Sequence, residues 1–308
     1  MDTNLTLIAA TAIGKMMVMV LVGMLAVKIN VLDEKMTDGL KNVVMNILMP
    51  AVLLSSYFQE YSAEKARGLI MAIGYGIIMQ LSAIVISGIC IRKGSSPNWE
   101  VERMAIIYGN VAFMGIPLMN AMLGQESVFY LSGTIVAFNI FLWTHGVAMM
   151  TGKLDKKNFI KIFLSPNVIC IILGAILYFG RIPLSELVTQ PISNLGACVT
   201  PVSMIVSGAV IIRSDFKKIL TNYRVYFVTA LKLFVCPIVL MVLFKFMHTP
   251  YMIAITTVVA AACPTATLVT MFALQYGKNA EHASGIFTLA TTLSLFTIPA
   301  IVALYGMF

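Results

Sequence analysis

The sequence predicts an all-α membrane protein with ten transmembrane helices, arranged as a 5+5 inverted repeat. Three observations predict this fold class: long apolar runs, basic residues concentrated in alternate loops, and prolines at matching places in the two halves. Of the 308 residues, 59% are hydrophobic and only 11% are charged, and the mean hydropathy is +0.92. A soluble domain carries about 25% charged residues. Ten helices of about 20 residues each use roughly two thirds of the chain, which leaves too little for a soluble catalytic domain.

The ten apolar stretches are each long enough, or nearly so, to cross a bilayer. Eight contain no charged residue, and two are each interrupted by a single lysine, Lys15 or Lys232. The first stretch carries Asp2 instead of a basic leader and has the length of a full span, so we expect a membrane helix and not a cleaved signal. In chain order the stretches are Leu5–Val27, Asn42–Gln59, Gly68–Ile91, Met104–Gln125, Ser127–Gly152, Ile162–Gly180, Leu187–Ile212, Val225–Phe244, Phe246–Gly277 and His282–Phe308.

The net charge of +8 follows from the loops. Loops after odd-numbered spans hold 15 of the 21 Lys and Arg residues, whereas loops after even-numbered spans hold only Lys65, Arg67, Arg181 and Lys245. Basic residues gather in the short cytoplasmic loops of membrane proteins. We therefore expect a multi-pass protein of the plasma membrane with cytoplasmic odd loops and both termini outside. The basic groups face anionic lipid in this interpretation, and nucleic-acid binding is rejected.

Prolines lie inside two spans of each half. Pro50 and Pro117 lie in spans two and four, and Pro201 and Pro264 lie in spans seven and nine. These are corresponding places in two halves of five spans, residues 1–151 and 152–308. Because five is odd, the second half is inverted relative to the first, as in many secondary transporters.

The prolines predict helix breaks at Gly115–Pro117 and at Pro264, because proline lacks a backbone N–H and disfavours helix at the preceding residue. Freed backbone groups must then face protein or a water-filled cavity. Two half-helix N-termini at the bilayer middle favour an anion. Three polar residues lie near these breaks: Asn110, about two turns before Pro117, and Thr265 and Thr267, just after Pro264. Each could bind a ligand or could form hydrogen bonds with the broken backbone, and both roles stay open.

Ionisable groups inside the spans are few. All thirteen acids lie in loops, at span ends or at the N-terminus, so the carboxylate that a sodium or proton pump carries in its core is missing. Lys15 and Lys232 are expected to face the bundle interior as structural cations, because a lysine at the helix centre costs about 3 kcal/mol. Lys15 has the alternative role of reaching a substrate carboxylate. His145 is expected to be a packing residue.

No cofactor, metal or enzymatic activity is predicted. The sequence has no Walker A motif, no Ser/His/Asp order and no cluster of metal-binding residues. The five cysteines, which lie in apolar runs without a CxxC pair, are expected to be small packing residues.

The motifs around the prolines resemble those of the auxin efflux carrier family, which includes plant PIN carriers and bacterial malate or malonate permeases. The specific motif is Asn110-Val-Ala-Phe-Met-Gly-Ile-Pro-Leu118, which resembles the family's N-x-x-x-x-G-I-P-L segment. The resemblance extends in order along essentially the whole chain. Weaker agreement is seen at Asn46-Ile-Leu-Met-Pro50, Ser165-Pro-Asn167, Ala261-Ala-Cys-Pro-Thr-Ala-Thr267, Phe272-Ala-Leu-Gln-Tyr-Gly277 and Thr292-Leu-Ser-Leu-Phe-Thr-Ile-Pro299.

The resemblance implies a fold similar to that of bile-acid symporters and sodium–proton antiporters. Spans one, two, six and seven would form a scaffold, with a possible homodimer through it, and spans three to five and eight to ten would form a transport domain. Substrate would bind where spans four and nine cross, and would move by an elevator mechanism. The substrate-binding residues that the resemblance implies are Met49, Asn110, Gly115, Ile116, Pro117, Asn167, Cys263, Pro264, Thr265 and Thr267, with Lys232 and Lys15 as structural charges near the crossing.

Two departures bear on the substrate. The loop Gly152–Ser165 is short, and Pro264 is followed by Thr265 where plant carriers commonly have Gln. Both favour a prokaryotic-type permease for a mono- or dicarboxylate such as malate or malonate over an auxin-like acid. An anion channel, a membrane sensor on the same scaffold and a cation-coupled symporter are the alternatives.

Overall fold

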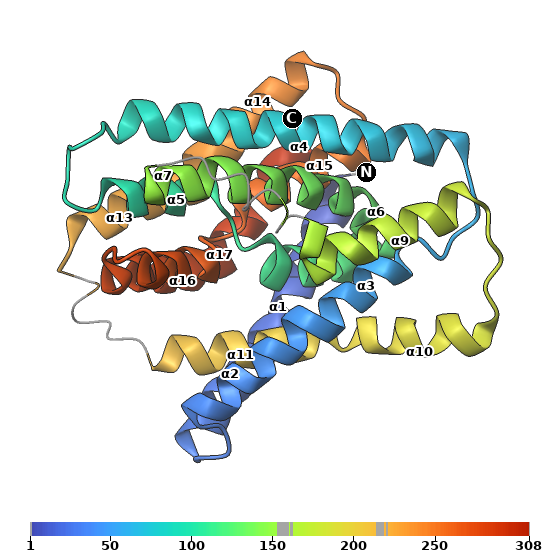
Figure 1. Cartoon of the computed structure of the whole chain (residues 1–308), viewed down its shortest axis with the longest axis horizontal. Helices are drawn as coiled ribbons and strands as arrows, with labels where there is room; N and C mark the ends of the chain where they lie inside the picture. Colours follow the sequence, from blue (N-terminus) through green and yellow to red (C-terminus); the bar gives the residue numbers. More distant parts are fainter. Residues whose placement is uncertain (1, 153–159, 161–162, 214–218, 220, 308) are drawn as a thin grey trace.

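The computed structural model describes residues 2–152, 160, 163–213, 219 and 221–307. The basic residues Lys153, Lys156, Lys157, Lys161, Lys217 and Lys218, which contribute to the predicted orientation, lie outside these residues. The described part of the chain is helical and has no β-strand beyond one isolated backbone bridge. Figure 1 shows α4 (Ala63–Cys90) along one edge of the molecule and α10 (Glu186–Ala197) and α11 (Val199–Ile212) along the opposite edge.

The other helices include four π-helical turns. They are α1 (Asp2–Lys28), α2 (Glu34–Val43), η1 (Val44–Leu48), α3 (Met49–Ser55), α5 (Trp99–Ile107), η2 (Val111–Gly115), α6 (Ile116–Phe141), η3 (Leu142–Gly146), α7 (Val147–Thr151), α9 (Pro166–Phe179), α13 (Tyr223–Ala230), η4 (Leu231–Val235), α14 (Cys236–Phe246), α15 (Tyr251–Ala262), α16 (Thr267–Gln275) and α17 (Ala280–Met307). Gly124 breaks α6 with a positive φ of 72°, a conformation that glycine adopts without strain.

Five helical stretches of the described chain are long and apolar enough to cross a membrane. They are Ala63–Cys90, Val111–Thr151, Glu186–Ile212, Tyr223–Phe246 and Ala280–Met307, and the shorter apolar helices are Pro166–Phe179 and Tyr251–Ala262. This composition and length are those of a multi-pass membrane protein.

Glycines bring two pairs of helices into backbone contact. Gly23 of α1 lies against the backbone of Ile205, and Gly208 of α11 lies against the backbone of Val20. On the other side of the molecule, Gly133 of α6 lies against the backbone of α4, where a methyl group would be 3.0 Å from the Leu69 carbonyl oxygen. Small residues allow this close approach in membrane helices, where packing replaces the hydrophobic effect as the force between helices.

The break that was predicted in span four at Gly115–Pro117 lies elsewhere. Pro117 is in the first turn of α6, and the helix runs through it because the preceding turn is widened: the Ile116 N–H donates to the Val111 carbonyl, one residue further back than in an α-helix. Because of this π-turn, the helix continues although proline cannot donate a backbone hydrogen bond. The same arrangement precedes Pro50 and Pro237. The actual break is at Tyr108–Asn110, between α5 and η2.

The second break lies where the sequence predicted it. Helix α15 ends at Ala262, and α16 begins at Thr267, with Pro264 in the extended segment between them. The two breaks also mark the border between two hydrophobic clusters. The buried hydrophobic residues of α5 up to Tyr108, and those from Ala266 to Ala273, belong to one cluster, whereas Val111 and Cys263 belong to the other.

Candidate functional site

The two broken helices cross at their breaks and are joined there by backbone hydrogen bonds. Gly109 and Thr265 form an isolated antiparallel bridge. The Asn110 N–H donates to the Pro264 carbonyl at 2.6 Å, and the Ala266 N–H donates to the Tyr108 carbonyl at 2.9 Å. The bridge satisfies backbone groups that a broken helix in a membrane cannot leave exposed to lipid.

Side chains strengthen the crossing. Thr265, fully buried, donates from Oγ1 to the Ala105 carbonyl of α5 at 2.9 Å. Gly115 lies against Cys263, since a methyl group on Gly115 would be 3.2 Å from the Cys263 sulfur. The Thr265 hydroxyl therefore serves the broken backbone, which was one of its two predicted roles.

Asn110 lies at the break itself and not two turns before it. Its Oδ1 accepts a long hydrogen bond of 3.4 Å from the Phe113 N–H and so caps the second half of the broken helix. Within the described residues no hydrogen bond involves its Nδ2, which leaves two N–H donors at the crossing. The side chain thus serves the backbone with one end and has the other end available for a ligand.

The helices that start at the crossing both direct their N-terminal ends toward it. One starts after Asn110, and the other, α16, starts at Thr267, a half-buried residue. A helix N-terminus carries a partial positive charge and free N–H groups, which favour an anion.

Lys232 lies at the same place. It is 2% exposed, and a methyl group placed on Gly109 would lie 2.9 Å from its Nζ and 3.3 Å from the carbonyl oxygens of Ala260 and Cys263. Lys232 also lines a cavity of about 10 Å³ with Gly109 and Val111, close to the smallest volume that holds one water molecule. Only glycine at position 109 leaves room for the ammonium group.

Lys15 was expected in the bundle interior, and this expectation is wrong. Lys15 is exposed on α1, whereas Ala12, Met16 and Val20 form the buried face of that helix. Residues four apart share a helix face, so Lys15 lies on another face than these three. It therefore contributes no charge to the crossing.

The remaining predicted site residues do not all lie at the crossing. Ile116 and Met49 are fully buried in one hydrophobic cluster, which also contains Cys263. Asn167 lies in the first turn of α9, a helix that packs against α3, and its buried Oδ1 has no hydrogen-bond partner among the residues that the structure describes. The structure therefore brings Asn110, Gly115, Pro264 and Thr265 together, but it does not place Asn167 in the crossing.

The structure also shows a buried ionic cluster that the sequence did not indicate. Glu102 of α5 is fully buried and accepts two hydrogen bonds of 2.6 Å from Nε and Nη2 of Arg224. His282 Nε2 lies 3.3 Å from Glu102 Oε1, and the Ser96 hydroxyl donates to the same oxygen at 3.1 Å. Burial alone would raise the pKa of Glu102, but the hydrogen bonds from Arg224 and His282 and the charge of Arg224 lower it to about 2. Glu102 is therefore ionised at neutral pH.

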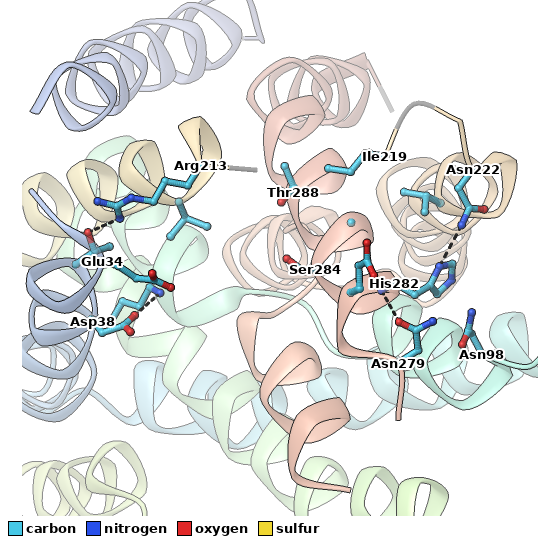
Figure 2. A pocket seen from close by; sticks show the side chains of 16 residues that line it. Glu34, Asp38, Asn98, Arg213, Ile219, Asn222, Asn279, His282, Ser284 and Thr288 are labelled. Carbon is cyan, nitrogen blue, oxygen red and sulfur yellow. Dashed lines mark hydrogen bonds and ion pairs between the residues drawn. The ribbon is translucent and has the colours of Figure 1, made fainter. Parts of the chain in front are cut away.

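This cluster adjoins a cavity of about 480 Å³, shown in Figure 2. Asn222, Asn279 and His282 line one side of it, and Glu34 and Arg213 line the other. The sequence places Glu102 and Arg224 at the ends of spans, but two residues so far apart in the chain give no sign that they form a pair.

His145, expected to be a packing residue, has a defined partner. Its Nδ1 lies 3.1 Å from the Tyr108 hydroxyl, which donates to the Phe141 carbonyl at 2.9 Å. Tyr108 lies at the break, so this contact connects η3 with the crossing.

Comparison with known proteins shows the family to which the chain belongs. The model of a family described as "Membrane transport protein" matches residues 8–160 and 149–302. An "Uncharacterized transporter" of Methanothermobacter thermautotrophicus is 21% identical over 291 residues, which are 92% of this chain and 94% of that protein. The chain therefore belongs to this family of membrane transport proteins, the auxin efflux carrier family that its motifs resemble.

Proposed function

We propose that the protein is a secondary transporter that moves a small organic anion, a mono- or dicarboxylate such as malate or malonate, by an elevator mechanism. The observation that carries this proposal is the crossing of the two broken helices. Their backbone bridge between Gly109 and Thr265 fixes two helix N-termini at one point. Discontinuous helices that meet in this way form the substrate sites of many secondary transporters.

The electrostatics of the crossing favour an anion. Two helix N-termini, the Asn110 Nδ2 group and the Lys232 ammonium all present positive or donor groups there. The nearest carboxylate along α5 is Glu102, about 10 Å before Gly109 at 1.5 Å per residue, and Arg224 already neutralises it. Asn110 and Thr267 are the proposed polar contacts of the substrate, and Lys232 is the proposed structural cation.

We further propose ten spans in two inverted repeats, residues 1–151 and 152–308. All ten predicted stretches contain helix in the described residues. The glycine contacts between α1 and α11 support a scaffold of spans one, two, six and seven, and the contact between α4 and α6 supports a transport domain of spans three to five and eight to ten. In this arrangement both termini lie on the outer side of the plasma membrane, outside the cytoplasm.

The proposed partners are the substrate anion, membrane lipid and a second copy bound through the scaffold helices. Exposed apolar side chains such as Leu21 on α1, Ile70 and Ile89 on α4, and Leu173 on α9 suit contact with lipid or with another membrane helix.

Uptake by purified protein in liposomes tests this function. A panel of organic acids is first screened by thermal shift, because a bound ligand stabilises the protein by about 2.7 kcal/mol at a hundredfold excess over Kd. Uptake of the best acid must saturate and must speed up when the same acid is present on the opposite side. Flux without saturation or trans-stimulation would indicate an anion channel, and an absolute requirement for sodium would indicate a cation-coupled symporter.

A further inference from the structure

A second cavity, of about 590 Å³, lies where the loops after spans two and six meet, and we call it the outer cavity. Residues 57–61, Gln125, residues 177–184, Thr189 and Ser193 line it. Figure 1 shows the loop between α3 and α4 and the loop between α9 and α10 at the same end of the molecule. These loops follow even-numbered spans and hold few basic residues, so we expect this end to lie outside the cytoplasm.

Arg181 is the only basic residue among those that line the outer cavity, and its guanidinium group has free donors. Its Cζ lies 4.3 Å from the centre of the Tyr61 ring. An aromatic face attracts a guanidinium group without using its N–H donors. Within the described residues, no hydrogen bond or ion pair involves this group, and Glu60, the one acidic residue of the lining, does not pair with it. The cavity therefore contains an unpaired cation.

The backbone position of Arg181 is one at which glycine is usual. Helix α9 ends at Phe179, and the Ile182 N–H donates to the Leu177 carbonyl at 3.0 Å. The Arg181 N–H donates to the Tyr178 carbonyl at 3.2 Å, which completes a Schellman motif. The left-handed residue of this motif is Arg181, with a φ of 51°. Glycine would form the same turn with less strain, so the turn itself does not account for the arginine.

We propose that the outer cavity binds a small organic monocarboxylate. A guanidinium group matches the planar geometry of a carboxylate and can donate two hydrogen bonds to it. The rings of Tyr61 and Tyr178, with centroids 5.4 Å apart, offer an apolar surface to the rest of the ligand. A second carboxylate has no second cation to pair with, and Glu60 repels it.

Gln125 gives this site a contact with another part of the molecule. It follows Gly124, at which α6 is interrupted, and no hydrogen bond within the described residues involves its side chain. The other lining residues belong to spans two, six and seven or to their loops, which are the proposed scaffold, whereas Gln125 belongs to the proposed transport domain. Gln125 is about 14 Å further along α6 than Ile116, at 1.5 Å per residue, so the outer cavity is separate from the crossing.

A ligand that binds both Arg181 and Gln125 holds the two proposed parts in the arrangement seen here. Its occupancy should therefore slow transport. This consequence rests on the proposed transport function, whereas binding of the carboxylate does not.

Calorimetric titration of the purified protein in detergent with benzoate tests the site without any transport assay. Benzamide, which has nearly the same shape and no charge, should bind at least tenfold more weakly. Arg181→Gly should lower the affinity for benzoate about tenfold or more and should melt no lower than the unmodified protein, because glycine suits the positive φ. The control is Arg67→Gln, at an exposed position of α4 outside the cavity, which should keep the affinity for benzoate.

Three results would overturn the site: no binding of benzoate to the unmodified protein, equal affinities for benzoate and benzamide, or equal benzoate affinities in Arg181→Gly and Arg67→Gln. Isophthalate, which adds a second carboxylate to the same ring, tests the preference for one carboxylate. It should bind more weakly than benzoate, and Glu60→Gln should reduce the difference. Isophthalate binding as tight as that of benzoate would contradict this preference.

Uptake into liposomes tests the coupling. Benzoate added on the side of the outer cavity should slow uptake of the transported acid in the unmodified protein and in Arg67→Gln, and Arg181→Gly should lose this inhibition. If benzoate inhibits Arg181→Gly equally, it acts at another site and the coupling is refuted. If no organic acid is taken up by any variant, the proposed function fails, and calorimetry still decides whether the outer cavity binds a carboxylate.

Discussion

Replacing Arg224 by Met should destabilise the protein strongly, because it leaves the buried carboxylate of Glu102 without its positively charged partner. Glu102 is fully buried, and Arg224 is its bidentate partner at 2.6 Å. Removing one partner of a buried ion pair costs about 3–5 kcal/mol. The pKa gives the same magnitude: at about 1.4 kcal/mol per pH unit, the fall from 4.5 to about 2 corresponds to roughly 3 kcal/mol. Ser96 and His282 remain as partners, so we expect the lower end of the range.

The pH dependence follows from the sign of this shift. A carboxyl group whose pKa is lowered by folding stabilises the folded state above its unfolded pKa. The contribution of Glu102 is therefore complete above pH 4.5 and is lost as the pH falls toward 2. Arg224→Met should reduce this acid-dependent loss as well as the stability at neutral pH.

Thermal unfolding in detergent at pH 7 measures the effect. At about 2 °C per kcal/mol for a chain of this size, 3 kcal/mol corresponds to about 6 °C. The control is Lys278→Met, which breaks the partly exposed pair with Glu100 and should cost about 1 kcal/mol or less. The double variant Arg224→Met/Glu102→Met removes both charges and should melt well above Arg224→Met alone. Equal melting temperatures for Arg224→Met and Lys278→Met would refute the reasoning.

Three further outcomes are expected. Lys15→Leu should leave the melting temperature unchanged or raise it, because Lys15 is exposed on α1, and a fall of several degrees would mean that Lys15 has a buried partner in the membrane. Lys232→Ala should lower the melting temperature more than it alters the order of preferred substrates, since Lys232 packs against Gly109 at the crossing; native melting with a changed preference would instead make it a substrate ligand. In intact cells, an impermeant thiol reagent should label a cysteine at Thr3 and not one at Lys156, and labelling at Lys156 from outside would reverse the proposed orientation.

The sequence predicted the helical membrane class and the break at Pro264, because both depend on local chemistry. A long apolar run without charges directly indicates a membrane-spanning helix, and a proline removes a backbone donor wherever it lies. Proline does not, however, distinguish a break from a widened turn. Pro117 is accommodated by the π-turn at Val111–Gly115, and the break instead lies at Gly109, where the chain pairs with Thr265.

The remaining errors share one cause, which is that the deciding contacts join distant parts of the chain. Helix α1 is apolar on all sides, so its sequence does not indicate which face packs against the bundle. Only the packing of Met16 and Val20 against the bundle decides that Lys15 points outward. Glu102 and Arg224 look like ordinary span-end charges until the fold pairs them. Gly109 likewise carries no sequence signal of its contact with Lys232.

The central claim is that the substrate anion binds at the crossing, and Asn110 tests it most directly. Asn110→Asp keeps the Oδ1 oxygen that caps Phe113 but replaces the Nδ2 donor by a second carboxylate oxygen, which repels an anion. Loss of a hydrogen bond in a buried site costs about 1–3 kcal/mol, so affinity for the organic acid should fall about tenfold or more. Asn139→Ala, which removes a buried amide bonded to the Ile135 carbonyl within α6, is the matched control and should retain affinity. Uptake and binding that are normal in Asn110→Asp, or lost equally in Asn139→Ala, would contradict a substrate site at the crossing.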